Sequence, residues 1–317
     1  MNMQPKKGEM IATREGYGNA IAELGEKNKN IVVLDADLAK STRSYNFGKK
    51  FPKRFWYMGI SEADTICTAA GLALSGKIAF ASSFAVFITN RAYDQIRMSV
   101  CYSNANVKII GSHGGIITGA DGPSAQGILD ISTMRTMPLM RVFVPADFYE
   151  AKKATFAMAQ SEGPAYMRTT REGIPVLFDD SLEFKIGKGM VLVDGSDAAI
   201  IACGELVSQA LLAAKSLKKE KISAAVINMA SVKPIDRELI AKFAKKTNFF
   251  VTAEDAVING GLGSAVCEVL AETSPARVKR IGLDNTFAES GKPADLLKKY
   301  KMDADAIVQA VKYGLKN

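Results

Sequence analysis

Acid–base chemistry in this sequence has few side chains to draw on. The 317 residues include one histidine, His113, which excludes a zinc site built on several histidines or a histidine-rich acid–base site. The four cysteines are widely spaced and form no CxxC pair, so we expect thiols in a reducing compartment, the cytoplasm. Whatever reaction occurs here therefore takes most of its functional groups from elsewhere.

Glu62 is the carboxylate best placed for chemistry. It follows the aromatic segment WYMGIS, and small residues and an apolar helix come after it, which would leave it partly desolvated. The alternative, favoured on spacing alone, is an acidic residue that interacts with the dipole at the start of a helix. Phe84 and Phe87 are three residues apart, a spacing typical of core packing, but they could also form a stacking platform for a flat heterocycle.

Two glycine-rich runs could bring backbone close to a ligand. The first is GSHGGIITGADGPSAQG (Gly111–Gly127), where His113 stands at the end of a predicted strand. Its length and glycine density favour a functional loop, while for His113 itself a structural and a catalytic role stay equally open. The second run is NGGLGSAV (Asn259–Val266), whose spacing is not GxGxxG. For this run we prefer close packing or an interface turn to a dinucleotide site.

The positive charge of this chain is scattered. Lys and Arg number 41 against 33 Asp and Glu, a net charge of +8, but no basic stripe is interleaved with aromatics. Nucleic-acid binding is therefore not expected. Arg14, Arg168 and Arg171 instead lie near predicted sheet ends, which suits small phosphorylated substrates.

Alternating strands and helices must position these side chains. This alternation predicts a parallel sheet covered on both faces, in which ligands bind beyond the carboxyl ends of the strands. We predict a helix capped by Thr13. Further strands and helices of the first half are predicted over Ile31–Asp37, Thr65–Gly76, Lys77–Ser83, Ala92–Tyr102, Val107–His113, Met140–Asp147, Asp147–Glu162 and Pro164–Arg171.

The composition shifts over 172–189, after which a second alternation of strands and helices begins. We therefore predict an α/β protein with two doubly wound domains. The predicted boundaries are a flexible lead over 1–10, a first domain over 11–175, a linker over 176–189 and a second domain over 190–317. No run of 18 apolar residues occurs, so no membrane span is expected.

Taken together, the motifs resemble those of the C-terminal half of transketolase, that is, its pyrimidine-binding domain followed by its C-terminal domain. The resemblance covers the chain after about Gly8. It rests on IATRE (Ile11–Glu15), LDADLAKST (Leu34–Thr42), YMGISEADTICTAAGLAL (Tyr57–Leu74), SFAVFITNRAYDQIR (Ser83–Arg97), GSHGGIITGADGPSAQ (Gly111–Gln126), RVFVPAD (Arg141–Asp147) and RTTREGIP (Arg168–Pro175). It implies a thiamine-diphosphate enzyme. The GDG-to-NN motif that holds the diphosphate and Mg²⁺ in this superfamily is missing. The resemblance therefore implies one subunit of a split transketolase, whose partner subunit carries the diphosphate-binding domain and mainly holds the Mg²⁺.

The resemblance also implies residue roles. The cofactor-binding set is Glu62 for the ring nitrogen of the aminopyrimidine, Phe84, Phe87 and Asn90 for the walls of the pyrimidine pocket, and Asp37 near the cofactor. The substrate-binding set is Arg14, Ser41 and Arg171 for the sugar phosphate, and His113 and Asp121 for substrate hydroxyls. Glu62 and His113 would be catalytic, and this chain would supply no metal ligand. Ala125, where family members often have histidine, and Asn90, where a larger aromatic is common, keep a variant substrate open.

The leading hypothesis is a β-type subunit that transfers two-carbon ketol units between sugar phosphates. We expect a symmetric dimer of this chain at the centre of an α2β2 assembly, and an isolated chain that self-associates into an inactive oligomer. Three alternatives stay open: the β subunit of a 2-oxo acid dehydrogenase, a fragment of a deoxyxylulose-phosphate synthase, and a cofactor-free structural or regulatory homologue. The sugar-phosphate set argues against the first, the short chain against the second, and Glu62 with Phe87 against the third.

Overall fold

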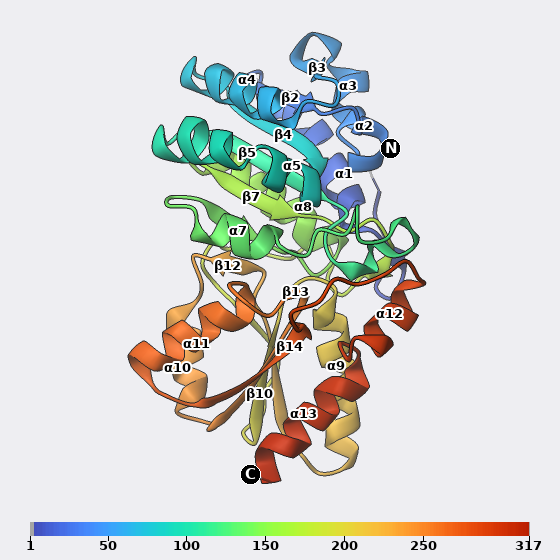
Figure 1. Cartoon of the computed structure of the whole chain (residues 1–317), viewed down its shortest axis with the longest axis vertical. Helices are drawn as coiled ribbons and strands as arrows, with labels where there is room; N and C mark the ends of the chain where they lie inside the picture. Colours follow the sequence, from blue (N-terminus) through green and yellow to red (C-terminus); the bar gives the residue numbers. More distant parts are fainter. Residues whose placement is uncertain (1–2, 317) are drawn as a thin grey trace.

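The computed structural model describes residues 3–316 and contains two large sheets with helices on both faces (Figure 1). The first sheet has seven strands in the order β12-β6-β7-β5-β4-β2-β3. Its central strands are buried along their whole length or nearly so, because apolar and small residues occupy both faces. The strands are β2 (Ile31–Asp35), β3 (Phe55–Tyr57), β4 (Ile78–Phe84), β5 (Val107–Ser112), β6 (Arg141–Phe143), β7 (Ala165–Arg168) and β12 (Ser231–Lys233).

Helices cover both faces of this first sheet. On one face α1 (Thr13–Lys27) packs against α8 (Phe148–Gln160). The other face carries α4 (Glu62–Leu74), α5 (Ala85–Arg91), α6 (Tyr93–Gln95), the π-helical η2 (Ile96–Tyr102) and α7 (Asp130–Thr136). Shorter helical segments follow the strands, namely α2 (Ala39–Thr42), α3 (Tyr45–Lys50), η1 (Pro52–Arg54) and η3 (Ile116–Asp121).

Two helix predictions are corrected by the structure. Ala12, and not Thr13, is the N-cap of α1. The Thr13 hydroxyl instead accepts a hydrogen bond from the backbone N–H of Thr170 at 2.7 Å, because the end of β7 passes beside the start of α1. The helix predicted over Ala92–Tyr102 is divided into α6 and η2, since the hydrogen-bond spacing widens from Ile96 onward.

The second sheet has five strands in the order β14-β13-β10-β11-β9, with only β9 antiparallel to its neighbour. Its strands are β9 (Met190–Val193), β10 (Ala198–Ala202), β11 (Ala224–Asn228), β13 (Phe249–Val257) and β14 (Arg277–Leu283). Figure 1 shows two helices on either side of it, α10 (Arg237–Ala244) and α11 (Leu262–Thr273) against α9 (Leu206–Lys219) and α13 (Ala304–Lys316). A further helix, α12 (Pro293–Lys299), packs against η3 of the first domain.

The two domains share structure. Strand β12 lies beyond the predicted linker, yet it pairs antiparallel with β6 and forms an edge of the first sheet. The predicted linker is also bound at its start, where the backbone N–H groups of Leu177 and Phe178 donate to the carboxylate of Asp147, each at 2.8 Å. The first sheet is therefore completed by residues of the second half of the chain.

The lead is more ordered than the sequence suggested. We predict a flexible segment over 1–10, of which residues 1–2 lie outside the described residues. Met10 and Ile11 form β1, paired antiparallel with β8 (Ile174–Pro175). The Tyr149 hydroxyl donates to the carbonyl of Pro5 at 2.9 Å. Because the lead satisfies its polar backbone groups on the first domain, it is bound along its length.

Candidate functional site

Five neighbouring strands bring the predicted site residues to one edge of the first sheet. The register aligns their carboxyl ends, because Asp35 pairs with Ser82, Phe84 with Ser112, and Gly111 with Arg168. Parallel strands that end at one level place the following residues side by side. The predicted residues that end or follow these strands are Asp37 after β2, Glu62 after β3, Phe84 and Phe87 at the end of β4, His113 after β5 and Arg171 after β7.

Glu62 is a buried carboxylate with a cation beside it. It is the first residue of α4, and its side chain is 4% exposed. Its Oε1 accepts a hydrogen bond from Nη1 of Arg91 at 3.0 Å, and the Arg91 guanidinium lies 4.2 Å from the centroid of the Phe87 ring. The Glu62–Arg91 pair therefore lies against an aromatic face. Arg91 was not predicted, because two residues 29 positions apart give no periodic signal.

Three flat rings form a stacked row beside this pair. Phe84 lies 5.5 Å from Phe87, with their planes 15° apart. On its other side Phe84 stacks on His113, with ring centroids 3.6 Å apart and planes at 18°. Phe84 and Phe87 are only half-buried, which sets them apart from the core residues of the sheet. The row thus presents aromatic faces at the edge of the site, where a flat heterocycle could stack.

His113 is held in an unusual backbone conformation and is almost fully buried. Its φ is +61°, and its Nδ1 lies 2.9 Å from the hydroxyl of Ser112. Burial lowers the pKa of His113 from 6.5 to about 3, and the positive charges of Arg14 and Arg171 lower it further. The imidazole is therefore neutral at pH 7. A neutral ring donates one hydrogen bond and accepts one, which suits contact with hydroxyl groups.

Arg14 and Arg171 approach His113 closely enough to lower its pKa. Nη1 of Arg14 donates to the backbone carbonyl of Ser41 at 3.1 Å, while its Nε is buried without a hydrogen-bond partner among residues 3–316. Nε of Arg171 lies 3.4 Å from a carboxylate oxygen of Asp121, and the same guanidinium pairs with Glu172. A cation with an unpartnered buried N–H is a suitable donor for an anionic group such as a phosphate.

Asp37 and Asn90 lie at the same edge but are exposed. Asp37 has a φ of +63°, in the loop between β2 and α2. In the described part of the chain, neither side chain forms a hydrogen bond with the Glu62–Arg91 pair. Ala125 is 8% exposed within the loop that follows His113. The structure therefore places these residues near the site without giving them a partner in it.

Asp35 organises the loop that carries Asp37 and Ser41, a role the sequence did not reveal. Its carboxylate accepts hydrogen bonds from the backbone N–H of Leu38 at 2.6 Å and from the hydroxyls of Thr42 and Ser44, each at 2.7 Å. Burial raises the pKa of Asp35 to about 6 despite these donors. Polar residues at a strand end were the available signal, but they could not show which carboxylate would turn inward.

Arg168 is not available for a phosphorylated ligand, which corrects the expectation above. Its side chain is 1% exposed and forms a two-pronged contact with the carboxylate of Asp130. It also donates to the backbone carbonyl of Gly127 at 2.9 Å and to that of Asp255 at 2.6 Å. Because the end of β7 faces the second domain, this guanidinium is used between the domains.

The second glycine run packs against a carboxylate of this chain. Glu254 accepts hydrogen bonds from the backbone N–H groups of Leu262 and Gly263 at the start of α11, each at 2.8 Å. A Cβ atom at Gly261 would lie 1.9 Å from the Glu254 Oε2. The donors that a phosphate would need are thus occupied by Glu254, and the close-packing interpretation of this run is confirmed.

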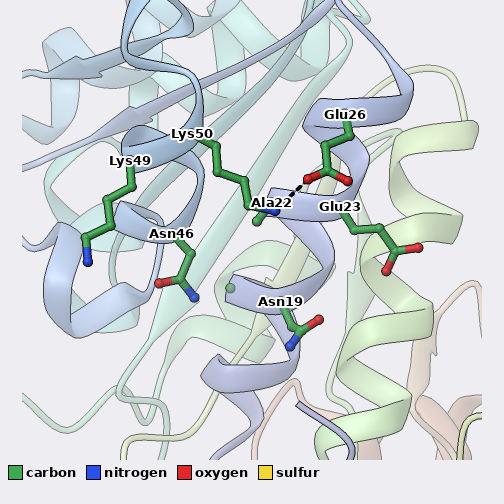
Figure 2. A pocket seen from close by; sticks show the side chains of 8 residues that line it. Asn19, Ala22, Glu23, Glu26, Asn46, Lys49 and Lys50 are labelled. Carbon is green, nitrogen blue, oxygen red and sulfur yellow. Dashed lines mark hydrogen bonds and ion pairs between the residues drawn. The ribbon is translucent and has the colours of Figure 1, made fainter. Parts of the chain in front are cut away.

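Other features of the molecule offer no rival site. The cavity in Figure 2, about 390 Å³, lies between α1 and α3 and is lined by none of the predicted site residues. Its charges are partly paired internally, with Lys50 at 2.6 Å from Glu26. Over residues 3–316, no group of three or more His, Cys, Asp or Glu side chains could hold a metal ion. Within the same residues, no helix combines the length and apolar character needed to cross a membrane.

The fold and this edge define an α/β protein of two domains, with a buried carboxylate, a row of rings and a pair of arginines at one sheet end. Residues 9–175 match the transketolase pyrimidine-binding domain, and residues 187–307 match the transketolase C-terminal domain. The chain therefore belongs to the transketolase family and corresponds to its C-terminal section.

Three relatives illustrate the match. A protein of Methanocaldococcus jannaschii named as a transketolase C-terminal section is 46% identical over 301 residues, which cover 94% of each chain. The transketolase of Mus musculus is 39% identical over 97% of this chain but only 49% of its own length. A solved structure described as a split-gene transketolase, an inactive β4 tetramer, is 48% identical with a TM-score of 0.91 and covers 96% of this chain and 99% of that one.

Proposed function

We propose that this chain is the β-type subunit of a split, thiamine-diphosphate-dependent transketolase that transfers two-carbon ketol units between sugar phosphates. The observation that carries the proposal is the convergence of Glu62, the stacked rings and the two arginines at one sheet edge. Carboxylate, aromatic faces and phosphate-binding cations are the groups that a pyrimidine cofactor and a phosphorylated sugar would need there.

The relatives support the split arrangement. The chain matches the M. jannaschii protein and the split-gene structure over nearly their whole lengths, but only half of mouse transketolase. The half of mouse transketolase outside this match has no counterpart in our sequence, and a GDG-to-NN motif is missing from it. A partner subunit would supply that motif and with it the diphosphate and Mg²⁺ site.

The residues present fit the aminopyrimidine half of thiamine diphosphate. When bound, the cofactor supplies the carbanion stabilisation that cleavage of a ketose carbon–carbon bond requires. Glu62 would hold a proton against a ring nitrogen, a role for which a buried carboxylate is suited. Arg91, which is about half exposed, would have to release Glu62 for this contact. Phe87 and Phe84 would bind the flat ring by stacking, beside Asn90 and near Asp37.

The sugar phosphate would lie on the arginine side of the edge. Arg14 and Arg171 would pair with its phosphate, with Ser41 beside them. His113 would exchange hydrogen bonds with substrate hydroxyls as a neutral ring, and Asp121 would accept from another. Because Ala125 cannot donate or accept through its side chain, the preference among donor sugars differs from that of relatives with histidine there.

Exposed apolar side chains give the first domain a surface for assembly. They lie on β3, α4, α6 and η2 and the turns beside them: Tyr57, Ile60, Leu74, Tyr93, Met98 and Tyr102. Helix α4 packs against α6 and η2, so much of this set belongs to one helical layer. Exposed apolar area of this kind marks a contact with another chain. We propose that it joins copies of this chain and the partner subunit in an α2β2 assembly in the cytoplasm.

The test is thiamine-diphosphate binding by calorimetry with Mg²⁺ present. The chain is titrated alone and after mixing with a candidate partner chain that carries the diphosphate motif. We expect tight, Mg²⁺-dependent binding and ketol transfer only in the mixture, with the partner alone as the control. Tight binding by the isolated chain would contradict the split-subunit proposal, and cofactor binding without ketol transfer from any sugar phosphate would contradict the reaction.

A further inference from the structure

Asp255 reaches from the second domain into the loop that carries His113. It stands on β13 and is 1% exposed. One carboxylate oxygen accepts from the backbone N–H of Ile116 at 2.8 Å, and the other accepts from that of Ile117 at 3.1 Å. These donors are three and four residues after His113. A carboxylate that accepts two buried N–H groups forms charge-assisted bonds, which are stronger than neutral ones.

Arg168 binds the other end of the same loop. It donates to the carbonyl of Gly127, where the loop ends, and to the backbone carbonyl of Asp255 itself. Its remaining contacts go to Asp130, so the buried cation has a full set of acceptors. The loop is thus bound at its start by Asp255 and at its end by Arg168, and the two binding residues also bind each other.

Two glycines directly after His113 make room for this arrangement. A Cβ atom at Gly114 would lie 2.4 Å from the Arg168 side chain. At Gly115 it would lie 2.0 Å from the Asp255 carboxylate, and the φ of +78° disfavours other residues there as well. The glycines of this motif therefore admit side chains of the protein, whereas the sequence suggested that they admit a ligand.

The backbone of His113 is fixed by the ordered loop. Its carbonyl accepts from the Thr118 hydroxyl at 2.9 Å and from the N–H of Gly127 at 3.2 Å. Thr118 follows the two residues bound by Asp255, and Gly127 is the residue bound by Arg168. Any shift of the loop would therefore move the carbonyl partners of His113, and with them a residue already held at positive φ.

Glu205 completes the surroundings of Asp255. Both of its carboxylate oxygens are buried without a hydrogen-bond partner among the described residues. Burial, and then the neighbouring Asp255, raise the pKa of Glu205 well above its usual range. Glu205 is consequently neutral at pH 7 and adds no second negative charge beside Asp255.

We infer that Asp255 and Arg168 are positioning residues of the site, through which the second domain holds the His113 loop in its working conformation. The inference rests on the proposed function, because it assigns the consequence of the clamp to a substrate contact of His113. Neither residue touches the ring row or the arginine pair in the described structure, so both act through the loop backbone.

The first test needs no activity, because this chain has a single histidine. Asp255→Asn keeps the shape of the side chain but leaves one acceptor oxygen for two N–H groups. Losing a charge-assisted bond corresponds to about a tenfold or larger change in local opening. We therefore expect amide hydrogen exchange at Ile116–Thr118 and acylation of His113 by diethylpyrocarbonate to be about tenfold faster or more. Asp284→Asn, the same change at an exposed position of the same domain, is the control and should change neither.

The wild-type chain provides a measurement that does not depend on how the variant folds. There, the amides of Ile116 and Ile117 should exchange more slowly than those of Ala120 and Asp121 in the same loop. Equal exchange of these four amides would overturn the clamp. Wild-type exchange and acylation in a folded Asp255→Asn chain would overturn it as well.

The second test uses the mixture with the partner subunit. Asp255→Asn should raise KM for the phosphorylated donor by about tenfold and leave cofactor affinity unchanged, because Glu62 and the rings are not bound by the clamp. An unchanged KM, together with faster exchange, would overturn the positioning role. If the wild-type mixture has no ketol-transfer activity, the proposed function fails, while exchange and acylation still decide the clamp.

Discussion

Glu62 is the residue on which the proposed chemistry depends most directly. Replacing it by alanine should lower ketol-transfer turnover in the mixture with the partner by about 10²–10⁴-fold, the range for a group that positions a proton. The assembly should persist, because the side chain that loses its partner, Arg91, is 49% exposed and stays hydrated. Steady-state rates and gel filtration of the same sample measure both effects.

Asp64→Ala is the matched control for this change. Asp64 lies in the first turn of the same helix and is exposed, so it removes the same charge without reaching the site. It should keep near-wild-type turnover. Substantial activity in Glu62→Ala, or an equal loss in Asp64→Ala, would contradict the role of Glu62.

The lone histidine also predicts a pH dependence. The pKa of His113 is about 3 in the folded chain against 6.5 ordinarily, so the unfolded chain binds more protons between these values. His113 therefore costs no stability above about pH 6.5 and progressively destabilises the fold as the pH falls toward 3. Selective ¹³C labelling of the one histidine measures the ring directly. Its resonance should not titrate between pH 5 and 8, and a midpoint near 6.5 in the folded chain would be inconsistent with the burial described here.

At the scale of elements, Glu254 replaces a ligand at the start of α11. Glu254→Ala would leave two buried N–H groups without an acceptor and remove a negative charge from a helix N-terminus. We expect the free energy of unfolding to fall by about 2–3 kcal/mol. Chemical denaturation followed by circular dichroism measures this fall.

Glu272→Ala serves as the comparison for that helix. Glu272 is exposed in its pair with Arg237, so its removal should change the free energy of unfolding by less than about 1 kcal/mol. Equal effects of the two substitutions would mean that Glu254 does not stabilise the start of α11.

The elements themselves were largely predictable, with clear physical limits. Buried apolar runs such as Ile31–Asp35 and the alternating helices identified the strands and the parallel sheet. Short edge elements escaped, because β12 has three residues and gains its stability only by pairing with β6. Thr13 was misassigned as a cap for a similar reason, since its partner Thr170 lies 157 residues away.

At the scale of the whole molecule, the exposed apolar layer predicts self-association of the isolated chain. Light scattering at micromolar concentration should give a mass at least twice that of the 34.0 kDa chain. Met98→Glu combined with Tyr102→Glu should lower that mass, because charges at these exposed positions oppose burial against another chain. A clean wild-type monomer would count against this proposal.

Phe287→Glu provides the control for the assembly experiment. Phe287 is 71% exposed but belongs to the second domain, away from the apolar layer on the first. The mass should stay that of the wild-type oligomer. A mass lowered equally by both changes would place the contact elsewhere on the molecule.

The sequence by itself determined the fold class, the strand ends and the set of residues that could meet there. Local patterns carry this information, because apolar periodicity and polar strand ends depend on near neighbours in the chain. Only the tertiary structure decided which of those residues are used within the protein. Arg168 turned out to be saturated by Asp130 and two carbonyls, and the glycines beside His113 admit Asp255, 139 and more residues away. Such contacts arise from how the two domains pack, which no local pattern encodes.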